Sequence, residues 1–118
     1  MTPKELQERT MRFAVRVLKL ADALPKTASG RTVANQVARS GCSIAANYRA
    51  ALRGKSRPDY INKITIVLEE ADETGFWIDL TGRAELLPAK RLVGLQNEAE
   101  QLTKIFNATR STARNRKS

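Results

Sequence analysis

The residues best suited to chemistry are acids clustered in one short stretch of the chain, namely Glu69, Glu70, Asp72 and Glu73. Carboxylates at helical spacing can hold two iron ions inside a helical bundle, but such centres also need a Glu-x-x-His pair from each of two helices. This chain has no histidine, and Cys42 is its single cysteine. The residue set therefore argues against a di-iron or zinc site and rules out Ser/His and Cys/His nucleophilic catalysis.

Other catalytic arrangements have no better support. The chain contains neither a Walker phosphate-binding loop nor a GxGxxG element. Glu70 and Glu73 could act as an acid and a base, but carboxylates three residues apart on a helix are usually solvated or paired with arginine. We therefore predict that the protein is not an enzyme and uses no metal or cofactor.

A structural role explains the acidic stretch more economically. The chain has no acid between Asp22 and Asp59, so a basic helix in this interval would supply partners for the acids that follow. Asn47 lies within an apolar stripe, where a lone polar residue usually sets the register of packed helices. A ligand-binding role for it is the alternative. The predicted polar network consists of Arg39, Asn47, Glu70 and Glu73.

The chain is strongly basic, with 21 Lys and Arg residues, 12 Asp and Glu residues, a net charge of +9 and a pI of about 10.3. Such a charge favours a polyanionic partner, with nucleic acid first and an acidic protein surface second. A solvated surface balanced by acids from another helix is the alternative. The predicted phosphate contacts are basic residues expected to be exposed: Arg12, Arg16, Lys19, Arg49, Arg53, Lys55 and Arg57.

Four amphipathic helices must position these residues, because apolar side chains recur at steps of three and four along most of the chain. Pro3, Gly54 and Pro88 mark helix boundaries. The predicted helices span about residues 3–24, 31–53, 58–81 and 88–110. Short connections make successive helices antiparallel, so residues 1–110 should form one all-α, up-down-up-down four-helix bundle. Residues 111–118 are predicted to be a basic, frayed C-terminal tail.

The third predicted helix has a wide apolar face. Its main stripe, at strict steps of three and four, is Ile61, Ile64, Leu68, Ala71, Gly75 and Ile78. A flanking apolar row makes this face wider than packing against one neighbouring helix requires. The extra width predicts a subunit interface formed by Tyr60, Val67 and Trp77. A broad core face explains the same row equally well, and the two aromatic rings could instead stack on nucleobases.

The length of the chain, its first residues and its single cysteine indicate how many domains it has and in which compartment it lies. With 118 residues the chain is long enough for one domain. Its start is charged and lacks the apolar run of a signal peptide, and no apolar stretch is long enough to cross a bilayer. A single cysteine fits a reducing compartment. We therefore expect a cytoplasmic protein with no membrane partner.

Residues 33–80 carry a more specific pattern. It comprises Ser43-Ile44-x-Ala46-Asn47-Tyr48-Arg49, followed by Ser56, Asp59, Tyr60, Ile61, Lys63, Glu70-Ala71-Asp72-Glu73-Thr74 and Trp77. This pattern resembles the bacterial four-helix-bundle family named after proteins encoded in intervening sequences of 23S ribosomal RNA. The resemblance implies an antiparallel four-helix bundle that assembles as a homopentameric ring.

The chain is also similar to the accessory variability proteins of diversity-generating retroelements. That resemblance implies basic pentamers associated with nucleic acid and a reverse transcriptase. Two function classes therefore remain open from the sequence. One is a non-enzymatic oligomeric bundle that binds RNA or DNA through its phosphates. The other is an interaction scaffold that docks an acidic protein partner such as a reverse transcriptase.

Overall fold

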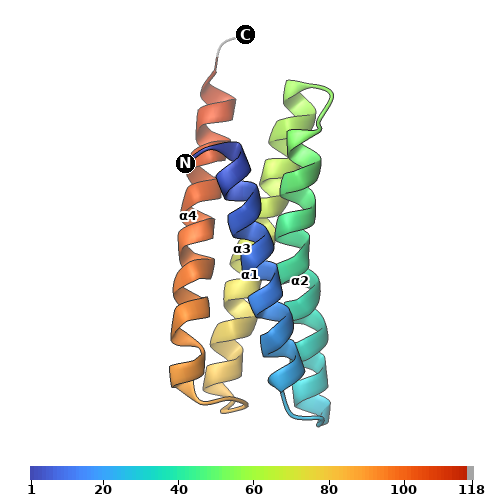
Figure 1. Cartoon of the computed structure of the whole chain (residues 1–118), viewed down its shortest axis with the longest axis vertical. Coiled ribbons are helices and arrows are strands. Elements are labelled where there is room, and N and C mark those ends of the chain that lie inside the picture. Colours follow the sequence, from blue (N-terminus) through green and yellow to red (C-terminus); the bar gives the residue numbers. More distant parts are fainter. Residues whose placement is uncertain (117–118) are drawn as a thin grey trace.

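Four long helices make up the structure, a computed structural model that describes residues 1–116 (Figure 1). They are α1 (Pro3–Ala23), α2 (Ala28–Leu52), α3 (Arg57–Arg83) and α4 (Val93–Asn115), with one 3-10 turn, η1 (Ala89–Arg91), before α4. Residues 1–116 contain no strand. Figure 1 shows successive helices running in opposite directions in a bundle of 50 × 21 × 19 Å. The prediction of an all-α four-helix bundle is confirmed.

Side chains that cap N-termini fix where three of the helices begin. Thr2 and Glu5 form a reciprocal capping box. The Glu5 backbone N–H donates to Thr2 Oγ1 over 3.1 Å, and the Thr2 N–H donates to a Glu5 carboxylate oxygen over 2.9 Å. These bonds hold the pKa of Glu5 below its ordinary value. Thr27 and Ser56 likewise accept hydrogen bonds from backbone N–H groups in the first turns of α2 and α3.

The starts of α2 and α4 differ from the predicted ones. α2 begins at Ala28 rather than at residue 31, because Thr27 already caps the helix. Pro88 precedes only the short η1 turn, and α4 starts later, at Val93. Both differences have the same cause. A proline or a capping residue shows that a helix can begin nearby, but several adjacent positions are possible and the packed structure decides among them.

The frayed tail predicted for residues 111–118 is wrong over most of its length. α4 continues to Asn115, and Ala113 is only 8% exposed. Arg57 of α3 donates two hydrogen bonds to the Ala113 carbonyl oxygen, so a contact between helices supports the last turns of α4. Residues 117–118, which end the predicted tail, lie outside the described residues.

One continuous apolar core runs along the bundle axis. Its largest fully buried side chains are Phe13, Phe106, Ile44, Ile64, Ile78 and Leu102. Val67 and Thr74 of α3 are also fully buried. The core face of α3 is therefore wider than the main apolar stripe and includes the flanking row to which Val67 belongs. Thr74 Oγ1 lies 2.9 Å from Ser40 Oγ, and this hydrogen bond joins two buried hydroxyl groups of α2 and α3.

Gly41 lets α1 and α2 approach each other closely. A Cβ atom at this position would lie 2.6 Å from Cγ1 of Val17, which is fully buried. At Gly75 of α3, the nearest atom to such a Cβ is the Ala99 Cβ at 3.8 Å, an ordinary van der Waals distance. Packing therefore requires glycine at the first position and tolerates a methyl group at the second.

Replacing Gly41 by alanine is expected to lower the free energy of unfolding by about 1–2 kcal/mol, because overpacking against Val17 outweighs the gain in helix propensity. The matched variant Gly75→Ala adds the same methyl group where space exists, and it should be neutral or stabilising by about 0.5–1 kcal/mol. Urea denaturation followed by circular dichroism measures both changes. Equal stabilities of the two variants would contradict the proposed close packing at Gly41.

Candidate nucleic-acid interface

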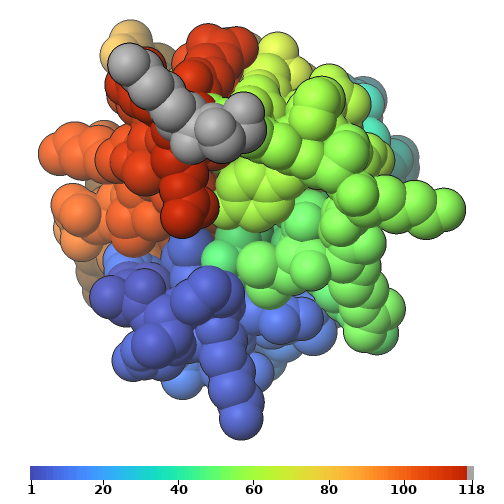
Figure 2. Space-filling model, turned by 90° about the horizontal axis from the view of Figure 1, so that it is seen from above, coloured from blue at the N-terminus to red at the C-terminus, as the bar shows by residue number. Residues whose placement is uncertain are grey.

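One end of the bundle gathers basic side chains from three helices. α2 ends there, α3 begins there and α4 ends there, whereas α1 begins further down the bundle (Figure 1). Residues 49–57 and 110–116 supply this end with seven basic residues, and the acid beside them, Asp59 in the first turn of α3, pairs with Lys63. We call this set the basic end: Arg49, Arg53, Lys55, Arg57, Arg110, Arg114 and Arg116. Figure 2 looks down on it and shows side chains around the α2–α3 turn, in green, projecting outward.

Most of the basic end is exposed to solvent. Arg49, Arg53, Lys55, Arg114 and Arg116 are exposed, and within residues 1–116 none of them forms an ion pair. Arg49 and Arg114 lie in the last turns of α2 and α4, where a cation also interacts favourably with the helix dipole. Their positions therefore have a structural benefit in addition to any role in binding.

Arg57 has a structural role at this end. Its Nε and Nη2 atoms donate to the Ala113 carbonyl oxygen over 3.1 and 2.6 Å, so α3 caps the last turns of α4. The Arg57 side chain is half-buried. The sequence predicts Arg57 as a phosphate contact, but the structure commits two of its donors to the protein backbone. Its positive charge still adds to the field of the basic end.

A groove of about 470 Å³ lies beside the basic end, between α3 and α4. Tyr60, Ile105 and Arg116 are among the residues that line it. Tyr60 is half-buried, and burial raises the pKa of its phenol above the ordinary value. The nearby Tyr48 is 3% exposed, and burial raises its pKa to about 12. The groove thus combines a neutral aromatic ring, an apolar wall and one cation.

The remaining predicted phosphate contacts lie on α1, away from the basic end. Arg12, Arg16 and Lys19 are all exposed. Arg16 and Lys19 line a small cavity together with Arg91, which precedes α4. The seven predicted contacts therefore divide between two regions and do not form one patch.

The fold adds basic residues that are not among the predicted phosphate contacts, namely Arg91, Arg110, Arg114 and Arg116. The last three belong to the segment after Glu100, which contains no acid. That lack of acids is the sequence feature that indicates a basic surface there. Their position beside the α2–α3 turn depends on how α3 and α4 pair. No local sequence feature specifies that pairing.

Arg39 connects α2 to the acidic stretch of α3. Its Nη1 donates to Glu70 over 2.9 Å, and its Nη2 pairs with Glu73. The Glu73 carboxylate also accepts a hydrogen bond of 3.0 Å from the indole Nε1 of Trp77. The hydrogen bond to Glu73, with further contributions from Glu70, raises the pKa of Arg39 above its ordinary value. Glu70 and Glu73 therefore serve to hold α2 and α3 in register.

Two predicted roles are wrong. The Asn47 amide donates to the carbonyl and hydroxyl oxygens of Ser43 over 3.0 and 2.8 Å, both within α2, so Asn47 does not take part in the network between helices. Val67 has no exposed surface and cannot form a subunit interface. Trp77 is half-buried and packs edge-on against Phe76, whose side chain is 56% exposed.

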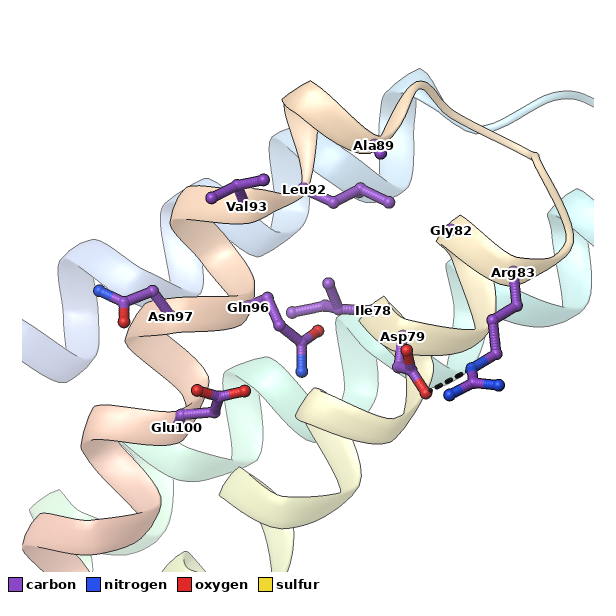
Figure 3. Close-up of a pocket in the computed structure, with 10 residues that line it drawn as sticks. All are labelled: Ile78, Asp79, Gly82, Arg83, Ala89, Leu92, Val93, Gln96, Asn97 and Glu100. Atoms are coloured by element: carbon purple, nitrogen blue, oxygen red, sulfur yellow. Dashed lines mark hydrogen bonds and ion pairs between the residues drawn. The ribbon is translucent and has the colours of Figure 1, made fainter.

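A second groove, of about 660 Å³, lies between the C-terminal part of α3 and the start of α4 (Figure 3). Asp79 and Glu100 line it, and Asp79 pairs with Arg83 over 3.0 Å. Gln96 points into the space between the helices, where its buried Oε1 has no hydrogen-bond partner. Arg83 also lines the groove and balances Asp79, so Glu100 leaves the lining with one net negative charge, which does not favour a phosphate backbone.

Within residues 1–116, no group of three or more His, Cys, Asp or Glu side chains is arranged to hold a metal ion. None of the helices in the same residues combines the length and the apolar character needed to cross a membrane.

Replacing Arg57 by alanine is expected to lower the free energy of unfolding by about 1–2 kcal/mol, because the Ala113 carbonyl loses two hydrogen bonds. Arg53→Ala removes the same charge from an exposed position nearby and should change stability by less than about 0.5 kcal/mol. Thermal and urea unfolding of both variants check this difference. A fully stable Arg57→Ala protein would show that the contact between α3 and α4 contributes nothing.

Comparison with known proteins agrees with this architecture. A crystal structure from Bacteroides thetaiotaomicron, described as a protein with unknown function from the S23 ribosomal protein family, is 32% identical in sequence, with a TM-score of 0.86. The alignment covers 94% of this chain and 99% of that one. No curated protein matches the sequence. The family model for the 23S rRNA-intervening sequence protein matches residues 4–108, and the chain therefore belongs to that family.

Proposed function

We propose that this protein is a non-enzymatic, basic bundle that binds nucleic acid through phosphate contacts, with the basic end as the main contact surface. The observation that carries this proposal is the meeting of seven basic residues from three helices, without an acid in the same segments. Phosphate oxygens would replace the missing counter-charges and release condensed cations from the nucleic acid. Binding should therefore depend steeply on salt and only weakly on base sequence.

The charge balance of the rest of the surface supports the same proposal. In the described residues only four basic side chains, Arg9, Arg39, Lys63 and Arg83, form ion pairs with acids. Most of the positive charge is therefore available to a polyanion. The family's name refers to 23S rRNA, and the similar crystal structure is assigned to a ribosomal protein family, which supports testing RNA first.

An interaction scaffold is the second candidate function. It would dock an acidic protein partner, such as a reverse transcriptase, on the basic end. The observation that favours a scaffold is a separate apolar stripe on the outside of α1. Met11, Val15 and Leu18 recur there at steps of four and three residues and are 50%, 48% and 45% exposed. A stripe of this kind also supports self-association, for which we propose a homopentameric ring.

Neutralising part of the basic end should weaken RNA binding. The variant Arg53→Gln, Lys55→Gln, Arg114→Gln removes three exposed cations, and each lost phosphate contact should reduce the salt slope by about one. Fluorescence anisotropy with a single-stranded RNA oligonucleotide over a range of salt concentrations measures this. The control variant Lys26→Gln, Arg31→Gln, Arg83→Gln has the same net charge, with the changes at the other end of the bundle.

Two outcomes would refute the nucleic-acid assignment or its location. Absence of RNA and DNA binding at low ionic strength would refute the function. Equal losses in the two triple variants would show that net charge alone matters and that the basic end has no special role. Partners that remain bound after nuclease treatment of a cell extract would instead support the scaffold.

The apolar stripe on α1 predicts how the subunits associate. Light scattering should give a mass near five times the 13.1 kDa of one chain. Val15→Glu places a charge in the centre of the stripe and should reduce the assembly to smaller species, since burying an unpaired carboxylate is costly. Val93→Glu is the control, because Val93 is 66% exposed and lies on α4. A monomeric wild-type protein would refute the ring, and a Val15→Glu protein of unchanged mass would refute this interface.

A further inference from the structure

Two pairs of charged residues face each other between α1 and α4. One pair has opposite charges and the other has two positive charges. Arg9 of α1 donates to both carboxylate oxygens of Glu98 of α4, over 2.7 Å each. Because the helices are antiparallel, later positions on α1 lie opposite earlier positions on the α4 side, and seven residues from this pair the chain reaches position 16 of α1 and position 91 of the η1 turn. Those two positions hold Arg16 and Arg91. Opposite charges therefore meet at the first level, and two cations meet at the second.

Arg16 and Arg91 line the same cavity, which has a volume of about 230 Å³ and also includes Lys19. Two buried leucines complete the lining. Within residues 1–116 none of the three cations forms an ion pair, although Asp22 follows Lys19 by three residues on α1. Three positive charges therefore converge without a carboxylate at ion-pair distance.

The adjacent start of α4 adds to this positive field. α4 has no acidic residue in its first turn and no side-chain cap. The Arg16 guanidinium lies over Gly94, where an added Cβ atom would be 3.2 Å from Nη2. The N-terminal end of a helix carries partial positive charge and normally favours an anion. An anion held among these cations would remove their mutual repulsion.

We propose that the cavity formed by Arg16, Lys19 and Arg91 binds one phosphate group. Guanidinium groups bind phosphate oxygens in a planar, bidentate arrangement, and the lysine ammonium adds a compact third charge. The cavity lies near the end of the bundle opposite the basic end, so it is a separate, discrete site. Free phosphate and the phosphodiester of a nucleic acid share this chemistry, and the experiment distinguishes these two sources.

The test uses the variant Arg91→Glu. It places a carboxylate opposite Arg16, so that this pair has opposite charges, as Arg9 and Glu98 do. In wild-type protein, adding sodium phosphate in place of chloride at constant ionic strength should shift the Gly94 amide NMR signal in a saturable way. In Arg91→Glu the phosphate affinity should fall by about tenfold or more. Its unfolding temperature in phosphate-free buffer should rise, because the new carboxylate supplies the missing counter-charge.

Arg53→Glu is the matched control. It makes the same change of charge at the basic end and should keep the phosphate response of Gly94 within about twofold of the wild-type affinity. A Gly94 signal that does not distinguish phosphate from chloride would overturn the proposal. Unchanged phosphate affinity in Arg91→Glu would overturn it as well, and the raised unfolding temperature excludes a folding defect as the cause of a loss.

An RNA oligonucleotide identifies the source of the phosphate group. If the cavity accepts phosphodiesters of a strand, the oligonucleotide should compete with inorganic phosphate at Gly94. If the cavity accepts only free phosphate, the oligonucleotide should leave the Gly94 signal unchanged. That result would still support phosphate binding in the cavity. RNA binding without any phosphate response at Gly94 refutes the pocket and leaves the proposed function intact. A phosphate response without RNA binding supports the pocket and refutes that function.

Discussion

An unpaired guanidinium or ammonium group is too costly to bury in an apolar core, and this constraint arranges the whole molecule. The chain has 21 basic residues and 12 acids, so at least nine of its cations have no acid of their own within the chain. A bundle that measures 21 × 19 Å across its long axis has room inside for only one face of each helix. The surplus cations must therefore lie on the outer faces and at the ends of the helices.

Three of the twelve acids connect neighbouring helices. Glu70 and Glu73 bind Arg39 and connect α3 to α2, while Glu98 binds Arg9 and connects α4 to α1. Each of these carboxylates is at least partly shielded from solvent, so each contact favours one register of two neighbouring helices. The nine other acids are too few to balance the 19 other basic residues, so positive charge remains in excess on the outer surface.

Charge is consequently uneven along the bundle. The basic end has seven cations from three helices, whereas the groove of Figure 3 near the other end has two carboxylates and one cation, Arg83, between α3 and α4. A polyanion would approach such a molecule in a preferred orientation, because attraction and repulsion act at different places on the same surface. The cation-lined cavity between α1 and α4 lies on a different seam from that acidic groove. The two seams thus have opposite electrostatic character although they share α4.

The sequence by itself determined the four helices, the excess of positive charge and the lack of histidine chemistry. Apolar periodicity and cap residues such as Thr2 and Ser56 act over a few residues, so they can be recognised locally. Only the tertiary structure decided that Val67 faces the core, because two adjacent rows of α3 are apolar and the rotation of the packed helix buries residues of both. It also decided that Arg16 meets Arg91 across the α1–α4 seam. Such contacts join residues far apart in the chain, and the packing of all four helices sets their register.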